Sequence, residues 1–180
     1  GQPKAGVVVP GLMATHYKAS DGGMSGLDDV DSVIASQGAA GALLGGPTAV
    51  GLVDFRDPNN GSNGNFGPTS DFPGTNNGTD DQNATAVVTG TLSVNVADTY
   101  RFKHHGDDGG RLRIDGQDIV VDDNFHGHST AGPVSGDVFL PAGNYPFEYV
   151  SFEGGGGWSG ELSYDGLSQG LNYRTEHFAR

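Results

Sequence analysis

Apolar and polar residues alternate along several stretches in the second half of the chain. The clearest are residues 92–96, 99–104 and 111–114, in which every second side chain is suited to burial. A period of two places those side chains on one face of a β-strand. Shorter apolar runs at 119–121, 138–140 and 145–152, and the pair Leu162 and Tyr164, continue the series. The pattern predicts a fold built mainly from strands.

Turn residues mark the connections between these strands. Asp115-Gly116 provides two adjacent positions that accept positive φ, which is typical of a tight hairpin. Pro141-Ala142-Gly143-Asn144 predicts a second hairpin, between residues 138–140 and 145–152. We also expect the acidic turn at residues 106–110 to join two strands.

The first half of the chain is less regular. Residues 11–17 and 50–55 are typical of strands, whereas the small residues at 39–46 predict a loop. A short helix is predicted after the first of these strands, because four apolar residues recur there at helical spacing. They are Leu27, Val30, Val33 and Ile34. Asp28 and Asp29 suit the positive end of that helix better than they suit calcium.

A long polar stretch covers residues 57–81. Asp57, Asn59, Gly61 and Asn63 alternate like the start of a helix-loop-helix calcium loop, but position twelve of such a loop would be Pro68 instead of Glu. We therefore predict a surface loop and assign it no function.

The acidic turn contains the chemistry of greatest interest. Asp107 and Asp108 are adjacent within a glycine-rich turn, where two carboxylates repel and raise one another's pKa unless a cation lies between them. Oxygen donors are abundant nearby and sulfur is absent, which favours calcium over zinc. The alternative is a solvated turn in which Asp and Gly serve the backbone alone.

The histidines do not form a convincing zinc site. His126 and His128 lie among Gly and Ser, which favours a loop that contacts ligand without holding a metal. The same interpretation applies to His104 and His105. Because His104 is close to Asp107 in the sequence, it is also a candidate for the wall of a binding pocket. The acidic residues at 122–124 are expected to end a strand.

Composition narrows the classes of partner. The 180 residues suit one domain, and 9 Lys plus Arg against 22 Asp plus Glu give a net charge of −13. Such a chain lacks the basic clusters that nucleic acid and anionic membrane surfaces require. No cysteine is present, so disulfides and thiolate metal sites are excluded. No apolar run is long enough for membrane insertion.

Several spaced motifs together resemble the protective-antigen-type domain family. They fall in order at residues 100–102, 106–109, 111–112, 114–116 and 136–145. The resemblance covers roughly residues 11–167 and is strongest at 92–162. It implies an all-β antiparallel β-sandwich or barrel with a short N-terminal helix and long loops. The family occurs in bacterial toxins, adhesins and glycosidases and in yeast flocculins.

The resemblance also implies a binding site. In flocculin-like members, two aspartates joined by a cis peptide bind Ca²⁺ together with a later glycine-containing loop, and the calcium coordinates sugar hydroxyls directly. Asp107 and Asp108 match the aspartate pair. The later loop corresponds to residues 153–158, where Glu153 or the carbonyls of Gly154 and Gly156 would replace an asparagine ligand that has no certain counterpart here.

The expected ligands are mono- or oligosaccharides on cell-surface glycans, with terminal fucose, glucose or mannose. Their vicinal hydroxyls would complete the calcium coordination and bond to Asp107 and Asp108, while Trp158, His104 or His126 would pack against the ring. A place in the core or at its rim is the alternative for Trp158.

The expected organisation is a linker at residues 1–10, one domain at 11–167 and a tail or linker at 168–180. We expect a monomeric, non-enzymatic, extracellular module of a larger secreted protein, a bacterial cell-surface adhesin. Two other functions stay open, namely a structural spacer or protein-interaction module without sugar affinity, and an accessory carbohydrate-binding domain of a glycosidase.

Overall fold

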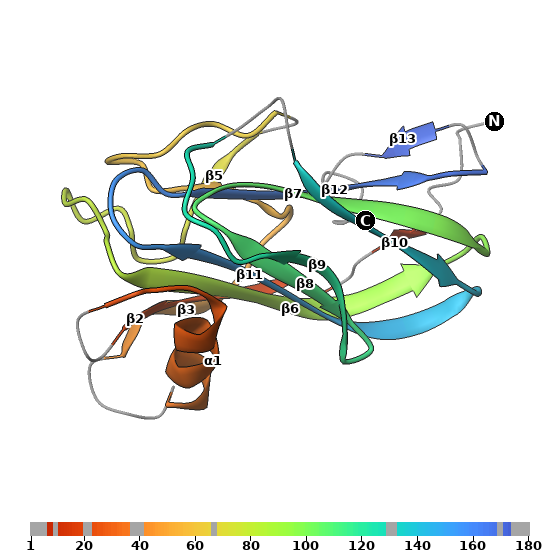
Figure 1. Cartoon of the computed structure of the whole chain (residues 1–180), viewed down its shortest axis with the longest axis horizontal. Helices are drawn as coiled ribbons and strands as arrows, with labels where there is room; N and C mark the ends of the chain where they lie inside the picture. Colours follow the sequence, from red (N-terminus) through yellow and green to blue (C-terminus); the bar gives the residue numbers. More distant parts are fainter. Residues whose placement is uncertain are drawn as a thin grey trace.

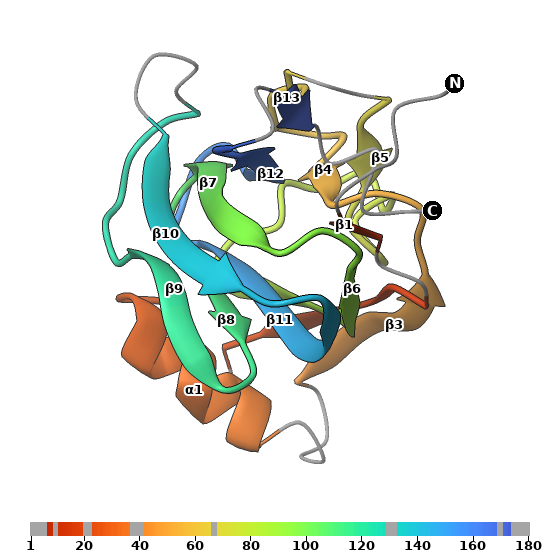
Figure 2. The ribbon, with the colours of Figure 1, turned by 90° about the vertical axis from the view of Figure 1, so that its right-hand side faces the viewer.

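Two β-sheets pack face to face, and one short helix lies against the outer face of one sheet (Figures 1 and 2). The computed structural model describes residues 7–8, 11–19, 23–36, 42–65, 68–128, 133–168 and 171–173. The two-sheet sandwich is the fold class that the sequence predicted. Within the described ranges, no helix is both long and apolar enough to cross a membrane.

Sheet 1 has the strand order β3-β2-β6-β11-β8-β9, and β1 also pairs with β6. Its strands are β1 (Val7–Val8), β2 (Met13–Lys18), β3 (Leu43–Ala49), β6 (Ala84–Val94), β8 (Gly110–Ile114), β9 (Gln117–Asp122) and β11 (Gly143–Glu153). All its pairings are antiparallel. The longest strands of this sheet, β6 and β11, pair with each other near its centre.

Sheet 2 has the order β10-β7-β12-β4-β5, and β13 pairs with β12. Its strands are β4 (Asp54–Arg56), β5 (Ser70–Asp71), β7 (Asp98–Asp107), β10 (Val134–Leu140), β12 (Ser159–Gly166) and β13 (Leu171–Tyr173). Only β4 and β5 pair in parallel. The central strand β12 places Glu161 beside His105 of β7 and Asp54 of β4.

The alternating apolar residues meet between the sheets, as the pattern requires. The largest fully buried side chains are Trp158, Tyr100, Tyr149, Tyr164, Phe55, Phe72, Phe102, Phe152, Leu12, Leu92 and Leu112. Trp158 stacks on Phe72 with ring centroids 3.8 Å apart. Val96, expected on the buried face, lies past the end of β6 and is 36% exposed.

The helix α1 (Leu27–Ala35) confirms the predicted helical spacing, with Leu27, Val30 and Val33 buried. These residues pack with Val87 and Phe152 on the outer face of sheet 1. The first helical N–H, that of Leu27, donates to Asp123 Oδ1 at 2.7 Å. An aspartate at the end of β9 therefore serves the helix terminus, and the residues at 122–124 have structural partners.

Several connections cross from one sheet to the other, whereas the Asp115-Gly116 hairpin stays within sheet 1. The Asp115-Gly116 hairpin between β8 and β9 is confirmed, with positive φ at both residues. The second predicted hairpin is wrong, because β10 pairs with β7 in sheet 2 while β11 pairs with β6 and β8 in sheet 1. The acidic turn likewise links β7 of sheet 2 to β8 of sheet 1.

Several predicted boundaries need correction. Strand β3 begins at Leu43, inside the segment expected to be loose, and residues 39–41 lie outside the described part. The strand expected at 50–55 is the shorter β4. In the two segments expected to be linkers, β1 and β13 pair with β6 and β12. Short pairing segments of this kind carry too few residues for an alternating pattern to be recognised.

Truncation of Trp158 is expected to destabilise the fold strongly, because its side chain is fully buried. Trp158→Ala should lower the free energy of unfolding by about 3–5 kcal/mol. Phe139→Ala is the matched control, since Phe139 is 62% exposed, and it should change stability by no more than about 0.5 kcal/mol. Denaturant unfolding measures both values. Similar small losses in the two variants would contradict the core position of Trp158.

Candidate metal centre

The acidic turn is held by the backbone of the opposite sheet. The peptide bond between Asp107 and Asp108 is cis, as the resemblance implied. Asp108 N donates to the carbonyl of Phe152 at 3.0 Å, and Phe152 N donates to the carbonyl of Gly109 at 3.1 Å. Gly109 has no room for a side chain, since a Cβ there would collide with Phe152 and with the Asp122 carbonyl. The turn is thus fixed against the end of β11.

Three carboxylates meet at this junction. Asp107, Asp108 and Glu153 each offer an oxygen, and these oxygens all lie within 4.8 Å of one another. Asp108 is anchored by two backbone donors, with Oδ2 accepting from Gly154 N at 2.9 Å and Oδ1 from His126 N at 3.0 Å. Strand ends from both sheets therefore bring these acidic side chains to one point.

The charges in this cluster are poorly compensated. Glu153 is fully buried, and neither of its carboxylate oxygens has a hydrogen-bond partner. Burial, and then the negative charge of Asp108 and Asp107, raise the pKa of Glu153 to about 9. Burial and the charge of Asp108 likewise raise the pKa of Asp107 to about 6. Without a cation, the cluster retains protons that ordinary carboxylates lose near pH 4.

These residues fit a hard divalent cation. The donor set consists of carboxylate oxygens, which calcium prefers, and the orphaned Glu153 carboxylate is an observation in favour of a missing ligand. The loop after Glu153 has open space at Gly156, where nothing lies within 4 Å of an added Cβ and φ is +106°. Magnesium is less suited, since it requires a stricter octahedral geometry.

The polar stretch at 57–81 contributes one wall of this centre, which sequence reasoning missed. Trp158 N donates to the Asn60 carbonyl at 2.8 Å. A Cβ on Gly157 would lie 3.0 Å from Asp107 Oδ2 and 3.2 Å from the Asn60 carbonyl. Asn60 Nδ2 also donates to Asp80 at 3.2 Å. The sequence shows that this stretch is rich in Asn and Asp, but it does not show that the stretch folds against the acidic turn.

The calcium-loop motif in that stretch is indeed structural. Asp57 Oδ1 accepts from Asn59 N at 2.8 Å, and Asp57 Oδ2 accepts from Asp81 N at 2.8 Å. Its carboxylate thus pins the two ends of the loop together. Asp57 is fully buried.

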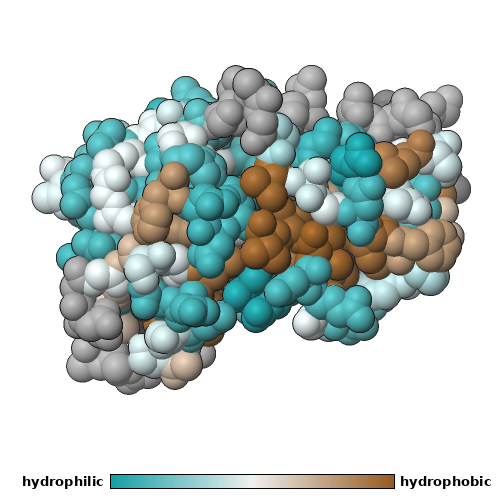
Figure 3. All heavy atoms as spheres, viewed as in Figure 1, coloured by the Kyte–Doolittle hydropathy of each residue, from teal (hydrophilic) through white to brown (hydrophobic). Residues whose placement is uncertain are grey.

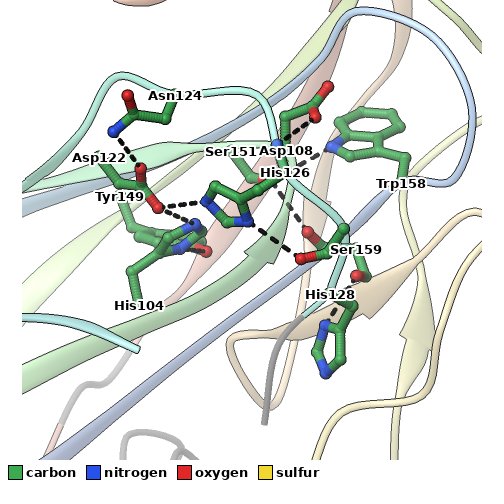
Figure 4. Close-up of polar contacts among 11 residues, drawn as sticks. His104, Asp108, Asp122, Asn124, His126, His128, Tyr149, Ser151, Trp158 and Ser159 are labelled. Carbon is green, nitrogen blue, oxygen red and sulfur yellow. Dashed lines mark hydrogen bonds and ion pairs between the residues drawn. The ribbon is translucent and has the colours of Figure 1, made fainter. Parts of the chain in front are cut away.

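A histidine network backs the centre (Figure 4). His104 and His126 both approach Asp122, with nitrogen–oxygen distances of 3.8 and 2.7 Å. His104 Nδ1 lies 2.8 Å from Tyr149 Oη. Burial lowers the pKa of His104 to about 4, so this imidazole is neutral near pH 7. The network supports the backbone of His126, whose N–H holds Asp108.

Three sequence-based expectations need correction. His104 belongs to β7 instead of a loop and is only 1% exposed, so its ring has no surface to offer a sugar. Trp158 is fully buried and donates from Nε1 to Ser151 Oγ, so it belongs to the core and does not present its ring to a sugar. The Gly154 carbonyl accepts from Asn83 N at 3.1 Å and is therefore directed toward that loop.

The other predicted site residues lie at or beside the cluster. Asp107, Asp108 and Glu153 meet, and Gly154 takes part through its N–H instead of its carbonyl. Gly156 lies in the open loop that follows. His126 lies in a loop, as predicted, and its side chain is 34% exposed. Hydrophilic residues dominate this left-hand end of the molecule, whereas apolar residues gather over β9 and β10 (Figure 3).

A separate hollow of about 460 Å³ lies on the outer face of sheet 1. Arg113, Phe147 and Glu148 are among the residues that line it. It contains no converging buried carboxylates, and Arg113 is already paired with Asp118 at 2.6 Å. We therefore base the functional interpretation on the acidic cluster.

Comparison with known proteins gives one matching family. A family model described as the PA14 domain matches residues 43–167. A comparison with curated protein sequences gives no match.

Solved structures share the fold at low sequence identity. The PA14 sugar-binding domain from an RTX adhesin is 22% identical with a TM-score of 0.63, over 96% of this chain and 99% of that one. The Epithelial Adhesin 6 A domain from Candida glabrata, in complex with Galb1-3GlcNAc, is 16% identical with a TM-score of 0.56, over 98% and 89%. An anti-sigma factor domain-containing protein is 17% identical with a TM-score of 0.61 over 93% of this chain. The chain spans 47% of the length of that protein.

The raised pKa values predict a pH dependence of stability. Between pH 4.5 and about 9, folded Glu153 holds a proton that the unfolded chain releases. Rising pH therefore destabilises the metal-free fold, by up to about 1.4 kcal/mol per pH unit for one such group. Thermal unfolding in chelator should show a midpoint that falls from pH 6 to pH 9.

The Glu153→Gln variant serves as the comparison for that experiment. Removing the titrating carboxyl should flatten the decline, and it should raise the metal-free midpoint at pH 8. An equally steep decline in this variant would show that Glu153 does not hold the extra proton.

Proposed function

The chain belongs to the PA14 domain family, and we propose that it is a calcium-dependent carbohydrate-binding module of a larger bacterial cell-surface adhesin. The observation that carries the proposal is the cluster of Asp107, Asp108 and Glu153, in which neither carboxylate oxygen of the buried Glu153 has a hydrogen-bond partner. A divalent cation at this point would remove the repulsion among the carboxylates.

Asp107, Asp108 and Glu153 would hold the calcium ion. Because calcium takes six to eight oxygen ligands, three side chains leave coordination positions for other oxygens. The open space beside Gly156 would admit them. Vicinal hydroxyls of a terminal sugar of the fucose, glucose or mannose type are suitable ligands. Charge-assisted hydrogen bonds to Asp107 and Asp108 would discriminate their orientation.

Two structural relatives support the sugar part of the proposal. One is described as a sugar-binding domain of an RTX adhesin, and the other is in complex with the disaccharide Galb1-3GlcNAc. For this chain, we propose that the partially exposed His126 imidazole would form the rim of the sugar position. Its backbone is fixed by the bond from its N–H to Asp108.

We propose binding instead of hydrolysis. Glycosidases separate their two carboxyl groups by about 5–9.5 Å and place them on either side of the scissile bond. In the acidic cluster, one oxygen from each of three carboxylates lies within 4.8 Å of the others, so the three groups converge on one point. Such an arrangement stabilises a cation more readily than it supports separate acid and base roles.

The contact with one sugar is small, so affinity for a monosaccharide should be weak. Display of several copies by a larger parent protein on the cell surface would supply avidity. The isolated module is expected to be monomeric, and an assay of export of the native parent protein tests the extracellular location.

Calcium should raise the thermal stability of the module. A ligand that binds only the folded state raises the unfolding midpoint by mass action, by about 2.7 kcal/mol of stability at a hundredfold excess over Kd. Asp108→Asn should abolish most of this rise, because it removes one of the three converging charges. Asp71→Asn, at an exposed position of β5, is the matched control and should respond like the wild type. An equal calcium response in the Asp108 variant would refute the assigned site.

Sugar binding should require the bound calcium. With calcium saturating, particular monosaccharides at millimolar concentration should raise the midpoint further, and excess chelator should remove that effect. Calorimetric titration with fucose, glucose, mannose and galactose gives the order of preference. A calcium response without any sugar response on a broad glycan array would favour a structural spacer.

A further inference from the structure

A second pair of acidic residues lies buried on the outer face of sheet 2. Asp54 of β4 and Glu161 of β12 are register partners in neighbouring strands. Asp54 is fully buried and Glu161 is 1% exposed. Their strand neighbours Phe55 and Leu162 belong to the core, so the two carboxyls point away from it. A loop must therefore cover them.

The covering segment is part of the polar stretch and includes Gly64 and Asn65. Glu161 Oε2 accepts from Asn65 N at 2.7 Å, and Glu161 Oε1 accepts from Asn65 Nδ2 at 3.1 Å. A Cβ on Gly64 would collide with both Asp54 Oδ1 and Glu161 Oε2. The backbone of Gly64 is thus packed closely against both carboxyls.

The same segment reaches the candidate metal centre. It continues back to Asn60, whose carbonyl accepts from Trp158 N and whose backbone lies beside Gly157 and Asp107. Gly61 packs so closely on the Trp158 carbonyl that a Cβ would collide with it. One short segment, from Asn60 to Asn65, therefore contacts both the carboxyl pair and the wall of the centre.

Three side chains with basic groups lie near the carboxyl pair. His105 of β7 is the register partner of Glu161, and its Nδ1 lies 3.3 Å from Asn65 Nδ2. His128 acts on Asp54 from the loop after β9, and burial lowers the pKa of His128. Arg56, on the same strand as Asp54, donates to Asn63. The Thr69 side chain acts to lower the pKa of Asp54, but neither carboxylate oxygen of Asp54 has a hydrogen bond of ordinary geometry with the described residues.

We propose that Asp54 and Glu161 share one proton and act as a latch that positions the segment from Asn60 to Asn65 against the candidate metal centre. The shared proton limits the buried pair to one negative charge, which the donors of Asn65 satisfy. Loss of that proton would place two negative charges side by side without water. The segment would then lift from Glu161 and admit solvent.

The direction of the pH dependence follows from burial. Burial, and then the negative charge of Glu161, raise the pKa of Asp54 to about 6. The closed position is therefore favoured below about pH 6 and is lost as pH rises through that value. The consequence for sugar binding rests on the proposed function, but the movement of the segment does not.

Hydrogen exchange of the amides at 60–65 tests the latch without sugar. After correction for the intrinsic effect of pH on exchange, wild-type protection should fall by about tenfold between pH 5 and pH 8. Asp54→Asn keeps the shape of the side chain, donates to Glu161 and does not titrate, so its protection should change by less than about twofold. Asp71→Asn, which neutralises an exposed carboxylate on β5, should behave like the wild type.

A second variant keeps the test decisive if Asp54→Asn does not fold. Gly64→Ala should force the segment away from the pair, so protection at 60–65 should be low at both pH values. Wild-type-like protection in Gly64→Ala at pH 5, or the same pH dependence in wild type and Asp54→Asn, would overturn the latch. Unchanged wild-type protection from pH 5 to pH 8 would overturn it as well.

The two proposals can fail separately. The exchange experiment needs neither calcium nor sugar, so a chain without calcium affinity could still show the latch. With calcium saturating and a binding sugar present, wild-type sugar affinity should fall by about threefold or more from pH 5 to pH 8, and Asp54→Asn should not show this loss. An equal loss of sugar affinity in the wild type and in Asp54→Asn would show that the latch does not control the sugar site.

Discussion

Repulsion among buried carboxylates at one end of the sandwich is the constraint on which the site depends. Two unit charges about 4 Å apart interact by about 4 kcal/mol at an effective dielectric constant of 20, which is a large part of the stability of an ordinary domain. Asp107, Asp108 and Glu153 cannot all be ionised here without compensation, and the orphaned oxygens of Glu153 show that the described protein groups do not provide it. The cluster therefore holds protons or a cation, and the two states exchange with pH and metal concentration.

The sandwich imposes this arrangement through two connections that cross between its sheets. Strand β7 ends at Asp107 in sheet 2, and β11 ends at Glu153 in sheet 1. The acidic turn then bonds to the backbone of Phe152, whose ring is fully buried. Because the position of Phe152 is set by packing, the apolar residues between and outside the sheets also determine the distance between the acidic groups. The geometry of the acidic cluster is therefore a consequence of core packing.

The sequence predicted which residues form strands better than it predicted which strands pair with each other. Alternation reveals which face of a strand is buried, and it identified Tyr100, Phe102, Leu162 and Tyr164 correctly. It does not reveal the strand that lies alongside, so the connection between β10 and β11 resembled a hairpin although the strands belong to different sheets. For the site, motif resemblance found the cis-linked Asp107 and Asp108. Residue type alone could not show that Trp158 and His104 are buried, or that Asn60 approaches from a distant loop, because both depend on tertiary packing.

Two acidic clusters in this protein meet the same electrostatic problem with different surroundings. At Asp54 and Glu161, the backbone of Gly64 is packed closely against both carboxyls, and a small shared proton is the proposed compensation. At Asp107, Asp108 and Glu153, the loop that follows has open space at Gly156, which suits the proposed binding of a larger ion with its own ligands. Glycine serves opposite purposes in the two places, because a missing side chain permits either close backbone contact or an unobstructed opening. The segment from Asn60 to Asn65 touches both clusters, and its position therefore links the charge of one to the shape of the other.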